Sequence, residues 1–274
     1  MSKDHAKVIE LFEKYGRNHE TVNWDKALFC VEDVMKAYAE MKQNENMTGL
    51  LAALRSHILS DGNLATNMRE SYAYLGAQRV MIDLFLEQNN REDAEKHLVQ
   101  LLNDLKQHKV DRHDYLLMHF YGIKQKLALP HFLPMAEAAL KASTSKDRYA
   151  HYFNYGEMLT AAGQRNKART LFIEGLDDPR LVDGLPPERQ ALMKAQMIHG
   201  LADNGIFDTE ALRIGEDLLK QQRTASTLSA VSKLRAGMGD TPGAIGLLEE
   251  ARDLEPDPKK KSGYEKRIAD LKAR

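Results

Sequence analysis

The chain has 274 residues, of which 43% are hydrophobic and 29% charged, and this balance excludes an intrinsically disordered protein. A formal net charge of −1 gives the whole molecule no field that would attract nucleic acid or an anionic membrane, and a single cysteine excludes an internal disulfide framework. Only 8 prolines and 17 glycines interrupt a composition rich in good helix formers, so we predict an all-α protein.

Residues 1–74 are predicted to be helical without matching the repeat described below. Four helices are expected, at 4–15, at 23–42 with Asn23 as N-cap, at 47–59, and from about 64 toward 88. The sequence Asp61-Gly62-Asn63 is a turn signal that separates the third helix from the fourth. Cys30 borders the apolar stripe of the second helix, so we interpret its thiol as a core group rather than a nucleophile. We interpret this region as divergent repeats, with a separate N-terminal docking unit as the alternative.

From residue 75 onward three segments align without gaps, at 75–108, 149–182 and 225–258. Asn89, Gly163 and Gly239 occupy the same position in each segment, and Gly163 and Gly239 tolerate the positive φ that a tight turn after a helix needs. The distances between these positions leave room for one more helix pair in each gap. Those pairs are predicted at 111–144 and at 187–222, with Asp208 or Thr209 capping the last helix.

Small side chains are expected where two antiparallel helices of a pair approach most closely. Gly156 with Ala168, and Ser232 with Ala244, supply such pairs. Thr241 is predicted to cap the helix that follows the last turn. The spacing thus predicts helical hairpins stacked in series.

The segments 149–176 and 227–256 resemble tetratricopeptide (TPR) repeats. The matching residues are Tyr152, Gly156, Gly163, Ala168 and Phe172 in the first segment, and Gly239, Asp240, Ala244, Ala251 and Pro256 in the second. The resemblance covers roughly residues 75–274. It implies an all-α fold in which about five to seven helix pairs form a right-handed α-α superhelix, a TPR-like solenoid.

The last segment, 262–274, is predicted to be a terminal capping helix that shields the end of the core. Ser262 and Glu265 match a capping box. Tyr264 and Ile268 follow on one face, whereas Arg267 and the other bases are assigned to the remaining faces.

The sequence carries none of the motifs that indicate catalysis. We find no phosphate-binding glycine loop, no paired-histidine zinc motif and no nucleophile elbow, and no two histidines are spaced i, i+3 or i, i+4. We therefore expect neither an enzyme nor a metal or other cofactor. The N-terminus lacks the apolar core of a signal peptide and no run of about 18 apolar residues occurs, so we expect a cytoplasmic protein.

The binding surface is predicted on the concave side, which the first helix of each pair usually lines. Uncommitted positions on these helices combine both charges with one aromatic ring, which suits an extended peptide or a partner helix. They are Arg79, Asp83, Phe153, Asn154, Glu157, Ser229 and Lys233. Some TPR proteins hold acidic chaperone tails in a basic clamp, but only Asn154 matches that clamp and Glu157 would repel a carboxylate.

We therefore expect a protein–protein interaction adaptor or scaffold that binds a peptide or partner protein in its concave groove. A peptide-responsive regulatory sensor and a regulatory subunit of an enzyme are the alternatives. An RNA-binding helical repeat is less favoured, because its groove would be basic whereas Asp83 and Glu157 are acidic.

Overall fold

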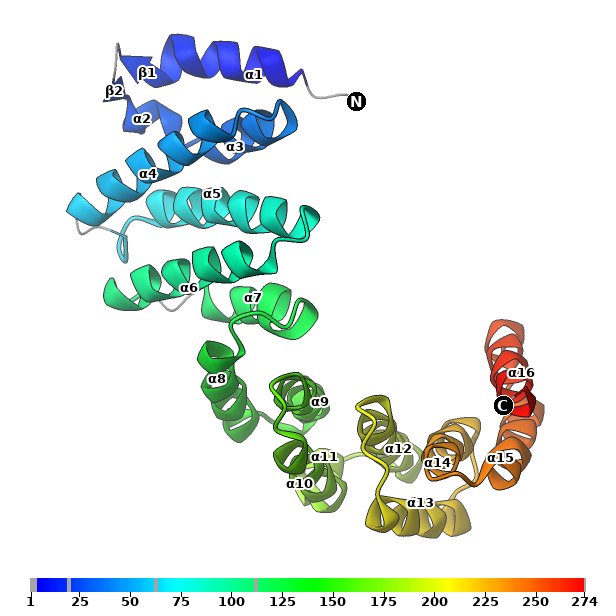
Figure 1. The fold of residues 1–274 in the computed structure, drawn as a ribbon. Helices are drawn as coiled ribbons and strands as arrows, with labels where there is room; N and C mark the ends of the chain where they lie inside the picture. Colours follow the sequence, from blue (N-terminus) through cyan, green and yellow to red (C-terminus); the bar gives the residue numbers. More distant parts are fainter. Residues whose placement is uncertain (1–3, 19–20, 62–63, 111–112, 274) are drawn as a thin grey trace. The chain divides into compact units, whose positions relative to one another are not determined.

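The computed structural model describes residues 4–18, 21–61, 64–110 and 113–273. The chain divides into two compact units, one ending at Ala128 and the other beginning at Leu129. Helices dominate both units, which confirms the predicted all-α class, and Figure 1 shows successive helices folding back on one another along each unit. A short antiparallel ladder pairs β1 (Arg17–Asn18) with β2 (Thr21–Val22).

The first unit is a series of short and long helices. They are α1 (His5–Leu11), the π-helical turn η1 (Phe12–Gly16), α2 (Trp24–Ala27), α3 (Val31–Glu40), α4 (Asn44–Asp61), α5 (Met68–Glu87), α6 (Arg91–Gln107), α7 (Asp114–Leu117) and the π-helical turn η2 (Met118–Lys124). Helix α5 packs on both α3 and α6 and supplies much of the buried core.

The helix expected over 23–42 is broken in the structure. Its first part ends at Ala27 and a new helix starts at Val31, because Cys30 takes a non-helical conformation with φ −127° and ψ 0°. Both Ala27 and Val31 are buried, so each side of the break contributes a residue to the core. No glycine or proline marks the break, and for that reason the sequence did not reveal it.

The start of α5 also differs from the prediction. This helix begins at Met68 rather than near Leu64, because the Asn67 side chain caps it by accepting the backbone N–H of Arg69 at 3.1 Å and of Glu70 at 3.3 Å. Residues 62–63 of the predicted turn lie outside the described residues, as do residues 111–112 at the start of the predicted pair 111–144.

The second unit contains the better-matching repeats. Its helices are α8 (Leu129–Ala142), α9 (Ser145–Ala161), α10 (Arg165–Asp177), α11 (Pro179–Val182), α12 (Pro187–Asp203), α13 (Thr209–Gln221), α14 (Ala225–Gly237), α15 (Thr241–Leu254) and α16 (Pro258–Lys272). Helix α12 packs against both α9 and α14, so these three first helices of their pairs lie next to one another (Figure 1). Helices α10 and α15 pack against α9 and α14 respectively.

The predicted turn residues adopt the left-handed conformation. Asn89, Gly163 and Gly239 have φ of 58°, 74° and 89°, and Gly205 in the intervening pair has φ of 66°. Each of these residues follows the end of the first helix of a pair. At the three aligned positions the two flanking helices, α5 and α6, α9 and α10, and α14 and α15, pack against each other.

Gly156 lies against an aromatic ring of the second helix of its pair. A Cβ built on Gly156 would come within 2.3 Å of the ring of Phe172, so the glycine makes room for that ring. Both Phe172 and Ala168 are fully buried in the core of the second unit. The signature residues thus hold α9 and α10 together through one aromatic ring.

Two predicted helix caps are wrong. Asp240, not Thr241, caps α15 and accepts a first-turn backbone N–H at 2.9 Å. The terminal helix begins at Pro258, not Ser262, because Asp257 caps it in the same way and proline fits a first turn, where no backbone N–H donor is needed. Of the two caps predicted for α13, Asp208 and Thr209, it is Asp208 that caps the helix.

Candidate functional site

Five of the predicted surface residues lie on α9 and α14 in the second unit. Phe153, Asn154 and Glu157 are half-buried on α9, and the Phe153 ring lies 6.1 Å from that of Tyr149. A Cβ built on Gly200 of α12 would meet Phe153 at 3.4 Å, so this ring contacts the neighbouring first helix. The aromatic part of the predicted surface therefore forms where α9 meets α12.

The other two predicted residues, Arg79 and Asp83, belong to the first unit and contact η2. The Arg79 guanidinium lies 4.9 Å from the centroid of the Phe120 ring. The carboxylate of Asp83 accepts a hydrogen bond from the hydroxyl of Tyr121 at 3.0 Å. Both side chains thus help to hold α5 against η2.

A cluster of basic groups follows on α12, α14 and α16. Lys233 of α14 forms an ion pair with Asp203 of α12. Arg267 of α16 donates hydrogen bonds to the hydroxyls of Ser229 at 2.7 Å and Ser232 at 3.2 Å. Ser229 is consequently only 5% exposed, covered by the guanidinium. We call Lys233, Arg267 and His199 of α12 the basic cluster.

The three members of the basic cluster influence one another. Burial, together with the nearby charges of Lys233 and Arg267, lowers the pKa of His199 to about 4. Burial and the charge of Arg267 likewise lower the pKa of Lys233. His199 is therefore neutral at pH 7, and two cations lie close together beside it.

Arg267 differs from the other arginines of this unit that are partly or fully buried. Among the described residues it has no carboxylate partner, and its side chain donates hydrogen bonds to two serine hydroxyls. By contrast, Arg148 pairs with Asp178 and Arg235 with Glu216, each at 2.6 Å. Sequence analysis placed Arg267 among the solvent-facing bases. Arg267 follows Tyr264 by three residues and precedes Ile268 by one, and this spacing in the sequence indicates a side chain that lies partly towards the core.

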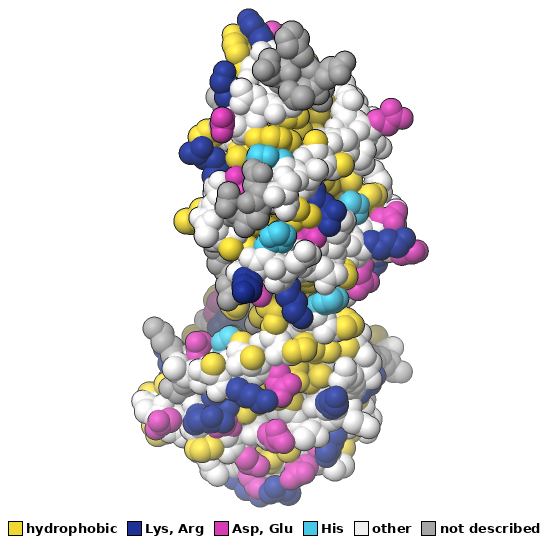
Figure 2. Space-filling view, turned by 90° about the vertical axis from the view of Figure 1, so that its left-hand side faces the viewer, with side chains coloured by type: hydrophobic (Ala, Val, Ile, Leu, Met, Phe, Trp, Pro, Cys, Tyr) yellow, Lys and Arg dark blue, Asp and Glu magenta, His cyan; other side chains and the backbone are white. Residues whose placement is uncertain are grey.

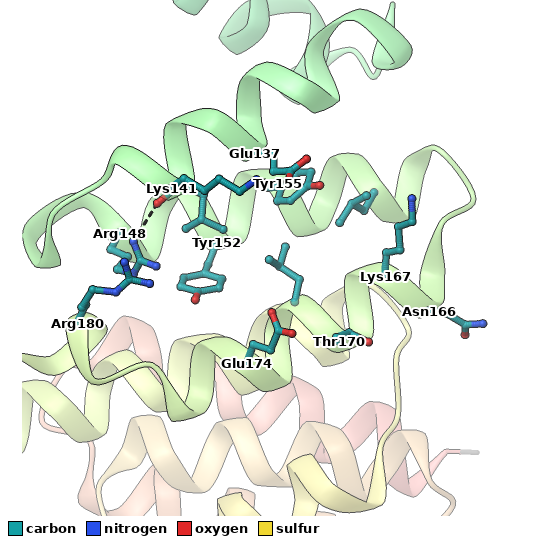
Figure 3. Close-up of a pocket in the computed structure, with 13 residues that line it drawn as sticks. Glu137, Lys141, Arg148, Tyr152, Tyr155, Asn166, Lys167, Thr170, Glu174 and Arg180 are labelled. Carbon is teal, nitrogen blue, oxygen red and sulfur yellow. Dashed lines mark hydrogen bonds and ion pairs between the residues drawn. The ribbon is translucent and has the colours of Figure 1, made fainter.

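A cleft of about 550 Å³ opens between α8, α9 and α10 (Figure 3). Its apolar floor is formed by Leu140, Tyr152, Leu159 and Leu171. Figure 3 shows Arg148 and Arg180 at one end, with Glu137, Lys141 and Tyr155 gathered on the α8 side. The described residues that line the cleft include no histidine, cysteine or serine.

The deep end of this cleft is a buried polar network. The Arg148 guanidinium donates to Asp178 at 2.6 Å and to the backbone carbonyl of Leu140 at 2.9 Å, and the Tyr152 hydroxyl donates to Asp178 at 2.8 Å. Burial alone would raise the pKa of Asp178, but hydrogen bonds from Arg148, Tyr152 and Arg180 outweigh it and lower that pKa to about 2. The network fastens α8, α9 and the start of α11 to one another.

On the face of the molecule drawn in Figure 2, side chains of both charges are interspersed rather than gathered by sign. Within the described part of the chain, no three histidine, cysteine or acidic side chains are grouped so as to hold a metal ion. Among the same residues, no helix has the length and apolar character needed to cross a membrane.

Comparison with protein-family models, curated protein sequences and solved structures found no match for this chain.

Proposed function

We propose that this chain is a TPR-like adaptor that binds a segment of a partner protein across α9, α12, α14 and α16. The observation that carries the proposal is Arg267, a half-buried guanidinium with no carboxylate partner among the described residues, next to the ammonium of Lys233. Buried charges in proteins are normally paired, because removing a charge from water without compensation is costly. An acidic group supplied by a partner would provide that compensation.

The surroundings of Arg267 suggest what kind of segment would fit. An acidic side chain near Arg267 and Lys233 would be accompanied by apolar or aromatic groups against Phe153 and Tyr149 at the α9 end. Burial raises the pKa of Tyr149, and the nearby charge of Glu157 raises it too. Glu157 therefore lies at the aromatic end of the surface, on α9. A carboxylate would therefore be placed at the α14–α16 end of the surface, where the cations are.

The proposal further includes a right-handed superhelix for the repeats from residue 75 onward. Its support is the recurrence of left-handed turn residues at Asn89, Gly163, Gly205 and Gly239, each closing one hairpin. In such an array the first helices stack side by side, which is the arrangement that α9, α12 and α14 adopt.

The test is affinity capture with the wild type and a matched pair of variants on α16. Arg267→Met removes the half-buried cation and keeps its volume, whereas Lys266→Met removes an exposed cation one position earlier. We expect one stoichiometric protein partner with wild type and Lys266→Met, and its loss with Arg267→Met while circular dichroism shows an intact fold.

Two results would overturn the proposal. One is a partner retained equally by both variants. The other is RNA that copurifies and is released at high salt, because a nucleic acid held through its phosphates shows that salt dependence.

A further inference from the structure

A second pocket, of about 370 Å³, lies between α4, α5 and α6 of the first unit. Its volume falls within the range of small-ligand pockets, roughly 300–1,000 Å³. Its lining is Thr48, Leu51, Ala52, Arg55, Ser56, Gln78, Met81, His97 and Gln100. No part of the proposed adaptor surface uses this pocket, since that surface lies in the second unit.

A chain of hydrogen bonds fixes the orientation of Gln78 in this pocket. Arg55 donates to both carboxylate oxygens of Asp104 at 2.9 Å, and the Tyr74 hydroxyl donates to the same carboxylate at 2.5 Å. Because its one hydrogen is used on Asp104, the Tyr74 oxygen can only accept, and Gln78 Nε2 donates to it at 2.8 Å. The amide of Gln78 therefore cannot be turned around, and its Oε1 is left as the free acceptor.

That acceptor is buried and unpartnered. Gln78 is 1% exposed, and its Oε1 has no hydrogen-bond partner among the described residues. His97 Nδ1 is a second buried atom of the pocket without one. Native proteins satisfy nearly all buried polar atoms, so two such atoms lining one cavity point to a ligand that supplies the missing bonds.

The pocket is also electrically neutral. The charge of Arg55 is balanced by the Asp104 carboxylate, and no acidic side chain is part of the lining. Burial lowers the pKa of His97, which packs against the Phe85 ring with centroids 5.3 Å apart, so its imidazole is neutral at pH 7. Leu51, Ala52 and Met81 supply apolar walls.

We infer that this pocket binds an uncharged amide group carried on a short apolar chain. The amide N–H would donate to Gln78 Oε1. Its carbonyl would accept from Arg55 Nη1, because Asp104 occupies only Nε and Nη2 of that guanidinium. A carboxylate has no hydrogen to donate to Gln78, and an ammonium would find no free acid, so both charged analogues fit less well.

Such an amide has two sources, a free small molecule or the side chain of a glutamine in a peptide. The experiment follows the Gln78 side-chain amide and Arg55 Nε–H signals of the isotope-labelled full chain by NMR. One arm titrates butyramide, with butyrate and butylammonium as charge-bearing controls. The other titrates the tripeptide Gly-Gln-Gly, with Gly-Glu-Gly as its control.

We expect saturable shifts of both signals with butyramide and none with either charged analogue. Tighter binding of Gly-Gln-Gly than of butyramide would identify a peptide source, and tighter binding of butyramide a small molecule; both support the amide site. Gln78→Met should weaken butyramide about three- to tenfold, followed through Arg55, whereas the exposed control Gln107→Met should leave it unchanged.

The inference is overturned if neither amide produces a saturable shift, or if butyrate or butylammonium binds as tightly as butyramide. Because this charge series uses the wild-type chain, it decides the question even if Gln78→Met fails to fold.

Discussion

The buried pair of Arg148 and Asp178 gives a stability prediction that can be worked from the structure. The two side chains are 3% and 6% exposed and 2.6 Å apart. Asp178→Asn keeps the size of the side chain but removes its charge, which leaves the Arg148 guanidinium buried without compensation. Loss of one partner of a buried pair costs about 3–5 kcal/mol, so we expect the free energy of unfolding to fall by that amount.

The assay is equilibrium unfolding in urea followed by circular dichroism. Asp217→Asn is the control, because the ion pairs of this carboxylate with Arg213 and Lys220 are exposed to solvent and should contribute far less to stability. Arg148→Met combined with Asp178→Asn should recover most of the loss, since no buried charge then stays unpaired. The reasoning is refuted if Asp178→Asn costs no more than Asp217→Asn.

The same carboxylate makes stability depend on pH in a defined direction. Its pKa is lowered from 3.8 to about 2 in the folded protein. The stability it contributes is therefore present above about pH 4 and is lost as the pH falls toward 2, by roughly 2–3 kcal/mol. Urea unfolding of Asp178→Asn should show a correspondingly flatter pH dependence than wild type over that range.

Further predictions concern packing, turns and the basic cluster. Gly156→Ala should lower the free energy of unfolding by about 1–3 kcal/mol in urea titrations, because its Cβ would overlap the Phe172 ring. Gly49→Ala, where the added Cβ meets no neighbour, should raise that free energy by about 0.5–1 kcal/mol, because alanine favours a helix more than glycine does. Gly163→Ala, at φ 74°, should cost about 1–2 kcal/mol in the same assay despite the free space around it. His199 should stay neutral down to about pH 4 in an NMR titration. The free energy of unfolding should fall as the pH drops from about 6.5 toward 4, because the unfolded chain binds this proton at a higher pH than the folded chain. A measured His199 pKa near 6.5 would contradict this reasoning.

The helical hairpins could be predicted because their turns depend on local backbone chemistry. Gly163 and Gly239 were recognised as residues that tolerate positive φ, and both have it. The start of α12 at Pro187 agrees with the predicted start of the pair 187–222, since proline favours the first turn of a helix. Signals of this kind lie within a few residues of the feature they determine.

Features that depend on contacts distant in the sequence were not predicted. The break at Cys30 has no glycine or proline beside it, so no local signal in the sequence records it. The environment of Arg267 depends on Ser229 and Ser232, more than thirty residues away along the chain, so a helical pattern alone assigned it to solvent. The fold was therefore easier to predict than the candidate site.

The most direct test of the proposed function is the affinity of the captured partner for three forms of the chain. Removing one member of a desolvated charge pair costs about 2 kcal/mol or more, so Arg267→Met should raise the dissociation constant by roughly thirtyfold or more. Lys266→Met should leave it within about twofold of wild type, because an exposed charge contributes little. Equal dissociation constants for wild type and Arg267→Met would contradict the proposal that a partner's acidic group binds at Arg267.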